Sequence, residues 1–167
     1  MGQSINKVRK NMKTISFDYD NVAGCCKAYA IPEESFVALT DESSSGTATL
    51  VTTDPDGIVE VPTYANDLSF DENSSQTDHG QLYDVAVSGS IPVLASTGED
   101  VLRRLECGRW LLLFQTRNGN TVLAGTKDVP LRFSRGRNVG PNADRTQFSF
   151  TAKEPEPSLY VTSSIVG

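Results

Sequence analysis

The segment from Arg109 to Gly125 reads RWLLLFQTRNGNTVLAG, and it predicts the fold more clearly than any other part of the chain. The apolar run from Trp110 to Phe114 has the length of a strand and is too short to span a membrane. Asn118-Gly119 then separates this run from a second apolar one, and this dipeptide favours the two positive-φ positions of a type I′ turn. The segment is therefore predicted to form a β-hairpin whose first strand is buried.

Other segments with alternating or β-branched composition predict further short strands. They are residues 14–19, 28–31, 35–39, 47–52, 57–61, 81–87, 130–134 and 146–152. One helix is predicted over about 97–107, because Ser96 and Glu99 have the spacing of a capping box and Gly108 suits the left-handed position that ends a helix. About nine short strands with one short helix indicate a mainly β protein, an antiparallel β-sandwich or barrel.

The chain has 167 residues, which is long enough for one domain with a buried core. We expect a basic N-terminal arm over residues 1–12, a single β-rich domain over 13–160 and a C-terminal tail over 161–167. Within the domain, residues 66–80 are rich in Ser, Asn, Asp and Gly. This segment is predicted to form a long polar loop, which is either a binding element or disordered.

Charge is distributed unevenly along the chain, whose formal net charge is −6. Residues 14–100 contain sixteen acids and one base, whereas residues 101–167 contain ten bases and five acids. The two blocks can face each other within one fold, or they can face neighbouring copies stacked head to tail. The candidate assembly contacts are basic residues of the arm and of a downstream cluster: Lys7, Arg9, Lys10, Lys13, Arg132, Arg135 and Arg137.

The downstream arginines, with Phe133 among them, also have the composition of a nucleic-acid contact. Phosphate binding needs a basic face that acidic residues nearby do not cancel, and this chain is acidic overall. Nucleic acid is therefore not expected as a specific ligand, and an acidic partner or a sister subunit is preferred.

The sequence contains no pattern typical of a catalytic or metal centre. His79 is the one histidine, and no nucleophile motif surrounds it. The three cysteines form no C-x-x-C, and residues 54–57, which read DPDG, are more typical of a turn than of a calcium loop. We therefore expect no enzymatic activity, no cofactor and no metal, while an unrecognised pair of carboxylates suited to glycoside hydrolysis stays open as a third hypothesis.

The N-terminal segment gives an indication of the compartment in which the chain is made. The basic run near the N-terminus, from Lys7 to Lys10, is not followed by an apolar segment of the kind that secretory signals contain. We therefore expect synthesis in a cytoplasm and no association with a membrane.

A sequence of strand and turn signals runs through the second half of the chain. It comprises Gly108-Arg109-Trp110, the strand from Leu111 to Phe114, Asn118-Gly119, Leu123-Ala124-Gly125-Thr126, Pro130-Leu131-Arg132-Phe133, Pro141-Asn142-Ala143-Asp144, the strand from Phe148 to Lys153, and Leu159-Tyr160. Over about residues 81–160 this pattern resembles small structural proteins of the virions of tailed phages and prophages. The resemblance implies a virion protein of the tail, neck or connector, made in the cytoplasm of a host bacterium, with no cofactor and no active site.

Two functional hypotheses follow. The first is a non-enzymatic virion structural protein that binds copies of itself and other virion proteins in a tail, neck or connector layer. The alternative is a ligand- or carbohydrate-binding β-sandwich adhesion module with residues 66–80 at its rim. The expected burial of Trp110 disfavours the alternative, because carbohydrate sites usually present exposed aromatic rings.

Overall fold

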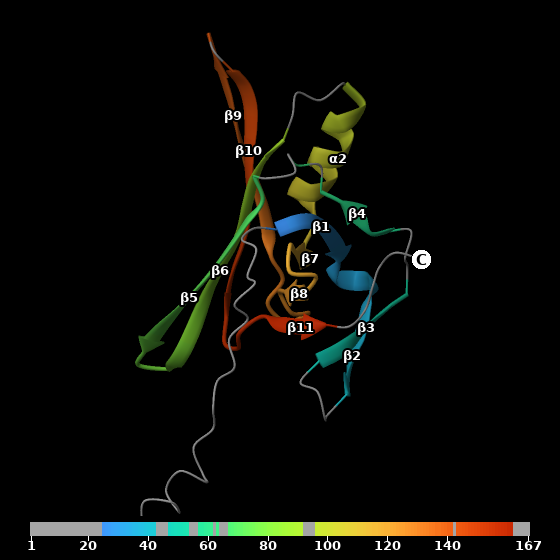
Figure 1. The fold of residues 1–167 in the computed structure, drawn as a ribbon, viewed down its shortest axis with the longest axis vertical. Helices are drawn as coiled ribbons and strands as arrows, with labels where there is room; N and C mark the ends of the chain where they lie inside the picture. The colour runs from blue at the N-terminus through green and yellow to red at the C-terminus, as the bar shows by residue number, and fades with distance from the viewer. Residues whose placement is uncertain are drawn as a thin grey trace, which may run out of the picture.

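A computed structural model of the chain describes residues 25–42, 47–53, 57–61, 63, 67–91, 96–141 and 143–161. These residues form two β-sheets, one 3-10 turn and one α-helix (Figure 1). The elements are β1 (Cys25–Pro32), η1 (Glu33–Ser35), β2 (Phe36–Glu42), β3 (Thr47–Thr52), β4 (Val59–Glu60), β5 (Ser69–Thr77), β6 (Gly80–Ile91), α2 (Ser96–Cys107), β7 (Trp110–Thr116), β8 (Thr121–Ala124), β9 (Arg132–Gly140), β10 (Ala143–Glu154) and β11 (Leu159–Val161).

The strands are divided between a seven-stranded and a four-stranded sheet. Their orders are β2-β3-β11-β8-β7-β1-β4 and β5-β6-β10-β9. Neighbouring strands are antiparallel except β11 and β3, which run parallel. The predicted mainly β sandwich with one helix is confirmed, and the described part of the chain contains eleven strands, slightly more than the nine or so predicted.

The central strand β7 is buried on both faces. Trp110, Leu112 and Phe114 belong to the large core between the two sheets, whereas Leu111 and Leu113 belong to a second apolar cluster on the other face. A continuous apolar run is typical of a strand without a solvent-facing side. Each such side chain contributes about 1.5–3 kcal/mol on burial, so β7 anchors both layers. The predicted burial of Trp110 is confirmed, since 2% of it is exposed.

The β7–β8 hairpin is confirmed, but its turn is not of the predicted type. Gly119 has a φ of +83°, whereas no residue other than glycine has a positive φ in the described part of the chain. The Gly119 N–H donates to the Thr116 carbonyl at 3.0 Å, and the Thr116 N–H donates to the Asn120 carbonyl at 2.8 Å. This geometry is a type I turn followed by a left-handed glycine. The prediction of a type I′ turn was wrong because this connection needs one left-handed residue, not two.

Helix α2 confirms the predicted helix, but Gly108 does not end it in a left-handed conformation. A Cβ on Gly108 would lie 2.6 Å from the Trp110 indole, so close approach of the ring requires glycine here. The indole Nε1–H donates to the Leu105 carbonyl at 2.8 Å. Trp110 thereby satisfies a carbonyl of the last helical turn, which has no partner within the helix.

The predicted polar loop over residues 66–80 is largely a strand. Residues Ser69–Thr77 form β5 and pair with β6 at nine successive positions, and Gly80, with a φ of +118°, closes the turn between them. Pairing with β6 satisfies the backbone of β5, and Phe70 packs its ring 4.6 Å from that of Phe114. Few apolar side chains are needed because β5 lies at the edge of its sheet.

The predicted ends of the domain are tested only in part. The arm over residues 1–12 and the strand over 14–19 lie outside the described residues. The predicted tail begins one residue too early, because Val161 is buried in β11 beside Thr121. Residues 162–167 also lie outside the described part of the chain.

The close contact between Gly108 and the indole gives a first test. We expect Gly108→Ala to lower the free energy of unfolding by about 1–3 kcal/mol, the usual effect of overpacking, because the hydrogen-bonded ring cannot move aside. Gly136→Ala is the control, since a Cβ there meets nothing within 4 Å. Urea unfolding of both variants measures the effect, and equal stabilities would refute this role of Gly108.

Candidate assembly surface

The four-stranded sheet ends in two edge strands of equal length. β5 and β9 each contain nine residues, and in the described part of the chain β5 pairs only with β6 and β9 only with β10. Figure 1 shows the β9–β10 end and the β5–β6 end extending beyond the seven-stranded sheet in opposite directions. An edge strand presents backbone N–H and C=O groups to which another strand can bind.

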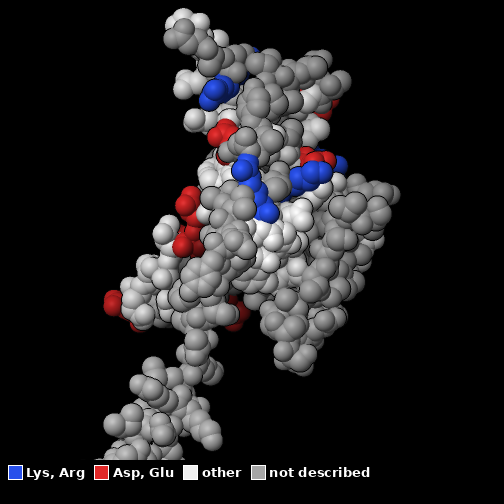
Figure 2. Space-filling view, viewed as in Figure 1, with Lys and Arg blue, Asp and Glu red and all other residues white. Residues whose placement is uncertain are grey.

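The two edges have opposite charge. β5 contains Asp71 and Glu72 and no base, whereas β9 contains Arg132, Arg135 and Arg137 and no acid. Figure 2 shows acidic side chains along the flank formed by β5 and β6, and basic side chains both at the β9–β10 end and over the middle of the molecule. One sheet therefore presents an acidic edge on one side and a basic edge on the other.

A row of serines crosses the outer face of this sheet. Ser69, Ser88, Ser149 and Ser134 lie in register on β5, β6, β10 and β9. The hydroxyls of Ser69 and Ser88 lie 2.9 Å apart, as do those of Ser134 and Ser149. The row lines a shallow hollow of about 460 Å³. Phe148, the aromatic residue in its lining, is buried, so this hollow does not present the exposed ring that the adhesion hypothesis needs.

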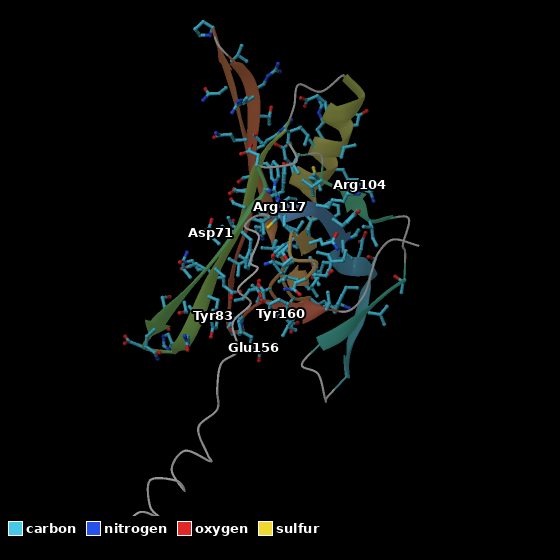
Figure 3. All side chains as sticks on the ribbon, in the orientation of Figure 1. Asp71, Tyr83, Arg104, Arg117, Glu156 and Tyr160 are labelled. Atoms are coloured by element: carbon cyan, nitrogen blue, oxygen red, sulfur yellow. The ribbon has the colours of Figure 1, made fainter. Side chains whose placement is uncertain are left out.

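The next row of the same face joins the two charged edges. Asp71 pairs with Ala86, Ala86 with Thr151, and Thr151 with Arg132. Asp71 and Arg132 are both exposed and stand at the two ends of this row. Asp71 lies on the outer side of the β5–β6 ribbon, away from the seven-stranded sheet (Figure 3). Neighbouring strands of the sheet are all antiparallel, so β5 and β9 are also antiparallel to each other.

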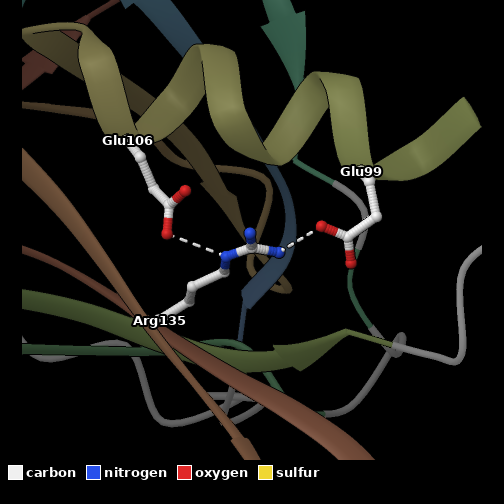
Figure 4. Close-up of polar contacts among 3 residues, drawn as sticks. All are labelled: Glu99, Glu106 and Arg135. Carbon is white, nitrogen blue, oxygen red and sulfur yellow. Dashed lines mark hydrogen bonds and ion pairs between the residues drawn. The ribbon is translucent and has the colours of Figure 1, made fainter. Parts of the chain in front are cut away.

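Arg135 points to the helix instead of to a partner. Its Nη1 lies 2.9 Å from Glu99 Oε2, and its Nε lies 2.8 Å from Glu106 Oε1 (Figure 4). These hydrogen bonds, first to Glu106 and then to Glu99, raise the pKa of the guanidinium. The hydrogen bond from Arg135 lowers the pKa of Glu99. Arg135 therefore ties β9 to α2 within the chain.

The other predicted assembly contacts have different positions. Arg132 and Arg137 are exposed on β9, and the structure places them on the basic edge. Lys7, Arg9, Lys10 and Lys13 lie outside the described residues. Of the seven predicted contacts, the structure thus brings Arg132, Arg135 and Arg137 to one strand.

Within the described part of the chain, ion pairs join the acidic and basic blocks of the sequence. Glu99 and Asp84 come from the acidic block, and they pair with Arg135 and Lys153 of the basic block. The Lys153–Asp84 pair is 3.5 Å long and largely exposed, so its contribution to stability is small. Ion pairs within the chain account for part of the uneven charge distribution. The edge residues Asp71 and Arg132 are not members of these pairs.

The acidic half of this surface was missed in the sequence. Asp71 and Glu72 lie in the segment that was predicted to be a loop, so no edge was assigned to them. In the structure, partly buried Phe70 and Glu72 alternate with exposed Asp71 and Asn73, but the sequence carries no matching alternation of apolar and polar residues.

Candidate chemistry elsewhere in the described residues is sparse. His79 is exposed in the β5–β6 turn, the thiol of Cys25 is buried, and that of Cys107 is exposed. Among the residues that the structure describes, no three His, Cys, Asp or Glu side chains are grouped so as to hold a metal ion. No helix in that same part of the chain is long and apolar enough to cross a membrane.

Comparisons with known proteins give no match. No family model matches the chain, and searches of curated proteins and of solved structures found none that is similar to it.

The ion pairs of Arg135 give a second test. We expect Arg135→Met to lower the thermal unfolding midpoint near neutral pH more than Arg132→Met, because only Arg135 bridges two helix carboxylates. The pKa of Glu99 is lowered in the folded state, so its contribution is present above the ordinary carboxyl pKa of 4.5 and is lost as the pH falls through the folded value.

The difference between wild type and Arg135→Met should therefore shrink as the pH is lowered below the ordinary carboxyl pKa. Thermal unfolding followed by circular dichroism at several pH values measures it. A difference that is independent of pH would show that Arg135 acts through packing alone.

Proposed function

We propose that this chain is a non-enzymatic structural subunit of the virion of a tailed phage or prophage, which self-assembles in a tail, neck or connector layer. The observation that supports self-assembly is the opposite charge of the two edges of the four-stranded sheet. The basic edge β9 of one copy binds the acidic edge β5 of the next copy.

The strand directions suit this arrangement. Because β5 and β9 are antiparallel, a neighbouring copy placed beside β9 in the same orientation brings its β5 antiparallel to β9. The alternating pattern of the sheet then continues across the boundary between copies, with backbone hydrogen bonds along both edges. Such a head-to-tail contact is heterologous, and it generates a ring where the rotation closes and a tube or filament where it does not.

The side chains favour this pairing over a symmetric one. When the rows of the sheet continue into the next copy, Ser69 lies beside Ser134 and Asp71 lies opposite Arg132. Opposite charges directly across an antiparallel pair stabilise it, whereas like charges destabilise it. A symmetric β9–β9 contact would place arginines of two copies together, and a β5–β5 contact would do the same with acids.

The place of the subunit in a virion is supported by the resemblance over about residues 81–160. Under this proposal the chain also binds other virion proteins. It is made in the cytoplasm of the host and becomes part of the virion. Edge-to-edge addition of many identical copies is what a ring or tube layer requires.

Charge reversal in two separate variants tests the pairing. Arg132→Glu places an acid opposite Asp71 of the next copy, and Asp71→Arg places a base opposite Arg132 of the next copy. Each variant alone should self-associate about tenfold more weakly than wild type, because one attractive pair per contact becomes repulsive. An equimolar mixture of the two should recover assembly, since alternating copies present opposite charges at every contact.

Light scattering and negative-stain microscopy of the purified chains measure assembly. Arg109→Glu is the control, because it makes the same change of charge at an exposed position outside both edges and should assemble as wild type does. Failure of the mixture to recover assembly would rule out β9–β5 pairing. A wild-type chain that stays monomeric at all concentrations would refute the proposed function itself.

A further inference from the structure

A small hollow lies beside the end of β10. Its volume is about 260 Å³, and it is bounded by the segment that follows β8 and by the connection from β10 to β11. The apolar part of its lining consists of Phe36, Leu111, Leu123, Pro157 and Leu159. Its polar lining consists of Thr126, Lys127, Asp128, Glu154, Glu156 and Ser158. A mainly apolar hollow with a few converging polar groups is the usual form of a small-ligand site.

Glu154 is the buried acid of this hollow. Only 2% of the residue is exposed, and its Oε1 accepts a hydrogen bond from the Gly125 N–H at 2.8 Å. Burial raises the pKa of the carboxyl, the Gly125 hydrogen bond lowers it in part, and the charge of Glu72 raises it further. A buried carboxylate is costly unless it is paired, and no base forms an ion pair with Glu154 among the described residues.

Ser158 leaves a second polar group of the hollow without a partner. Its backbone N–H donates to Glu72 Oε2 at 2.8 Å, which brings a second carboxylate to this region. The Ser158 Oγ is buried, and no hydrogen-bond partner for it exists in the described part of the chain. A buried hydroxyl without a partner costs about 1–3 kcal/mol, so a group that bonds it stabilises the site.

We propose that this hollow binds a primary ammonium group carried on a short alkyl chain. The Glu154 carboxylate and the Ser158 hydroxyl accept hydrogen bonds from the ammonium, and the alkyl chain packs against Leu111 and Leu123. An ammonium group has three donors and no acceptor, which matches two oxygen acceptors that need donors. The proposal is independent of self-assembly.

The charges around the hollow select a cation. Glu72, Glu154, Glu156 and Asp128 are acidic, and Lys127 is the one base in the lining. An anion would be repelled by this set, and a neutral alcohol would leave the carboxylate without a counter-charge. Glu156 and Asp128 are exposed, so their effect is screened by solvent, and Glu154 provides most of the discrimination.

The same arrangement makes binding depend on pH. Glu154 must be ionised to pair with the ammonium, and burial disfavours that form. An alkylammonium stays protonated up to a pH of about 10, so affinity rises with pH as Glu154 ionises. The other charged groups that face Glu154 are Glu72 on β5 and the rim residues Glu156, Asp128 and Lys127.

Nuclear magnetic resonance of the full chain tests the site directly. The amide of Gly125 reports on the Glu154 carboxylate, because the two are hydrogen-bonded. Titration with n-butylammonium chloride should shift the Gly125 and Ser158 amide signals saturably. n-Butanol and sodium chloride at matched concentrations should not. Nα-acetyl-lysine amide is titrated separately. If it binds, the site accepts a lysine side chain; if butylammonium binds and this compound does not, the site accepts a free amine.

Matched variants separate the buried acid from the rim. Glu154→Gln keeps the acceptor for Gly125 and should weaken butylammonium binding about tenfold or more, because it removes a charge-assisted hydrogen bond. Glu156→Gln, at the exposed rim, should weaken it less than about threefold. Equal binding by Glu154→Gln and wild type, or equal shifts with n-butanol, would overturn the proposal. Should Glu154→Gln fail to fold, wild-type affinity that does not rise as the pH is raised from below the ordinary carboxyl pKa of 4.5 to about 8 would overturn it equally.

Discussion

Burial of β7 on both faces is the constraint on which the rest of the structure depends. The even-numbered side chains of β7 pack against the four-stranded sheet in the main core. The odd-numbered side chains pack in a second apolar cluster on the other face. Trp110, at the start of the strand, then binds the end of α2 through the Leu105 carbonyl. The helix in turn holds β9 through Glu99, Glu106 and Arg135. A contiguous set of contacts thus leads from the most apolar segment of the chain to the basic edge of the outer sheet.

The parts of the fold that could be predicted are those with local signals. A continuous apolar run followed by Asn118-Gly119 indicates a buried hairpin whatever the rest of the chain does. The spacing of apolar residues likewise indicates α2. Strand β5 could not be predicted in the same way, because Phe70 is its only large apolar side chain and its stability comes from pairing with β6. The conformation of Gly108 depended on a ring two residues away, which composition does not reveal.

Of the candidate assembly surface, only the basic residues were identified from the sequence. Clustered arginines are visible in a sequence, and the structure places Arg132 and Arg137 on one exposed strand. The partners of Arg135 are two helix residues, 29 and 36 positions away, so its role within the chain could be found only from the fold. Asp71 could be assigned to the surface only from the structure, which places it on an edge strand and in one row with Arg132 across the two strands between them. Glu154 likewise has no distinguishing sequence context, since its burial results from segments on either side of β8 and β10.

In the assembly that we propose, the two edges of the four-stranded sheet bind each other between copies. Hydrogen–deuterium exchange of the wild-type chain at increasing protein concentration tests it most directly, because strand pairing protects backbone amides. The account predicts that the amides of β9 and β5 gain protection together over the same concentration range. The edge strands of the seven-stranded sheet, β2 and β4, should keep their exchange rates. Protection confined to one of the two edges, or no concentration dependence at either, would contradict head-to-tail pairing.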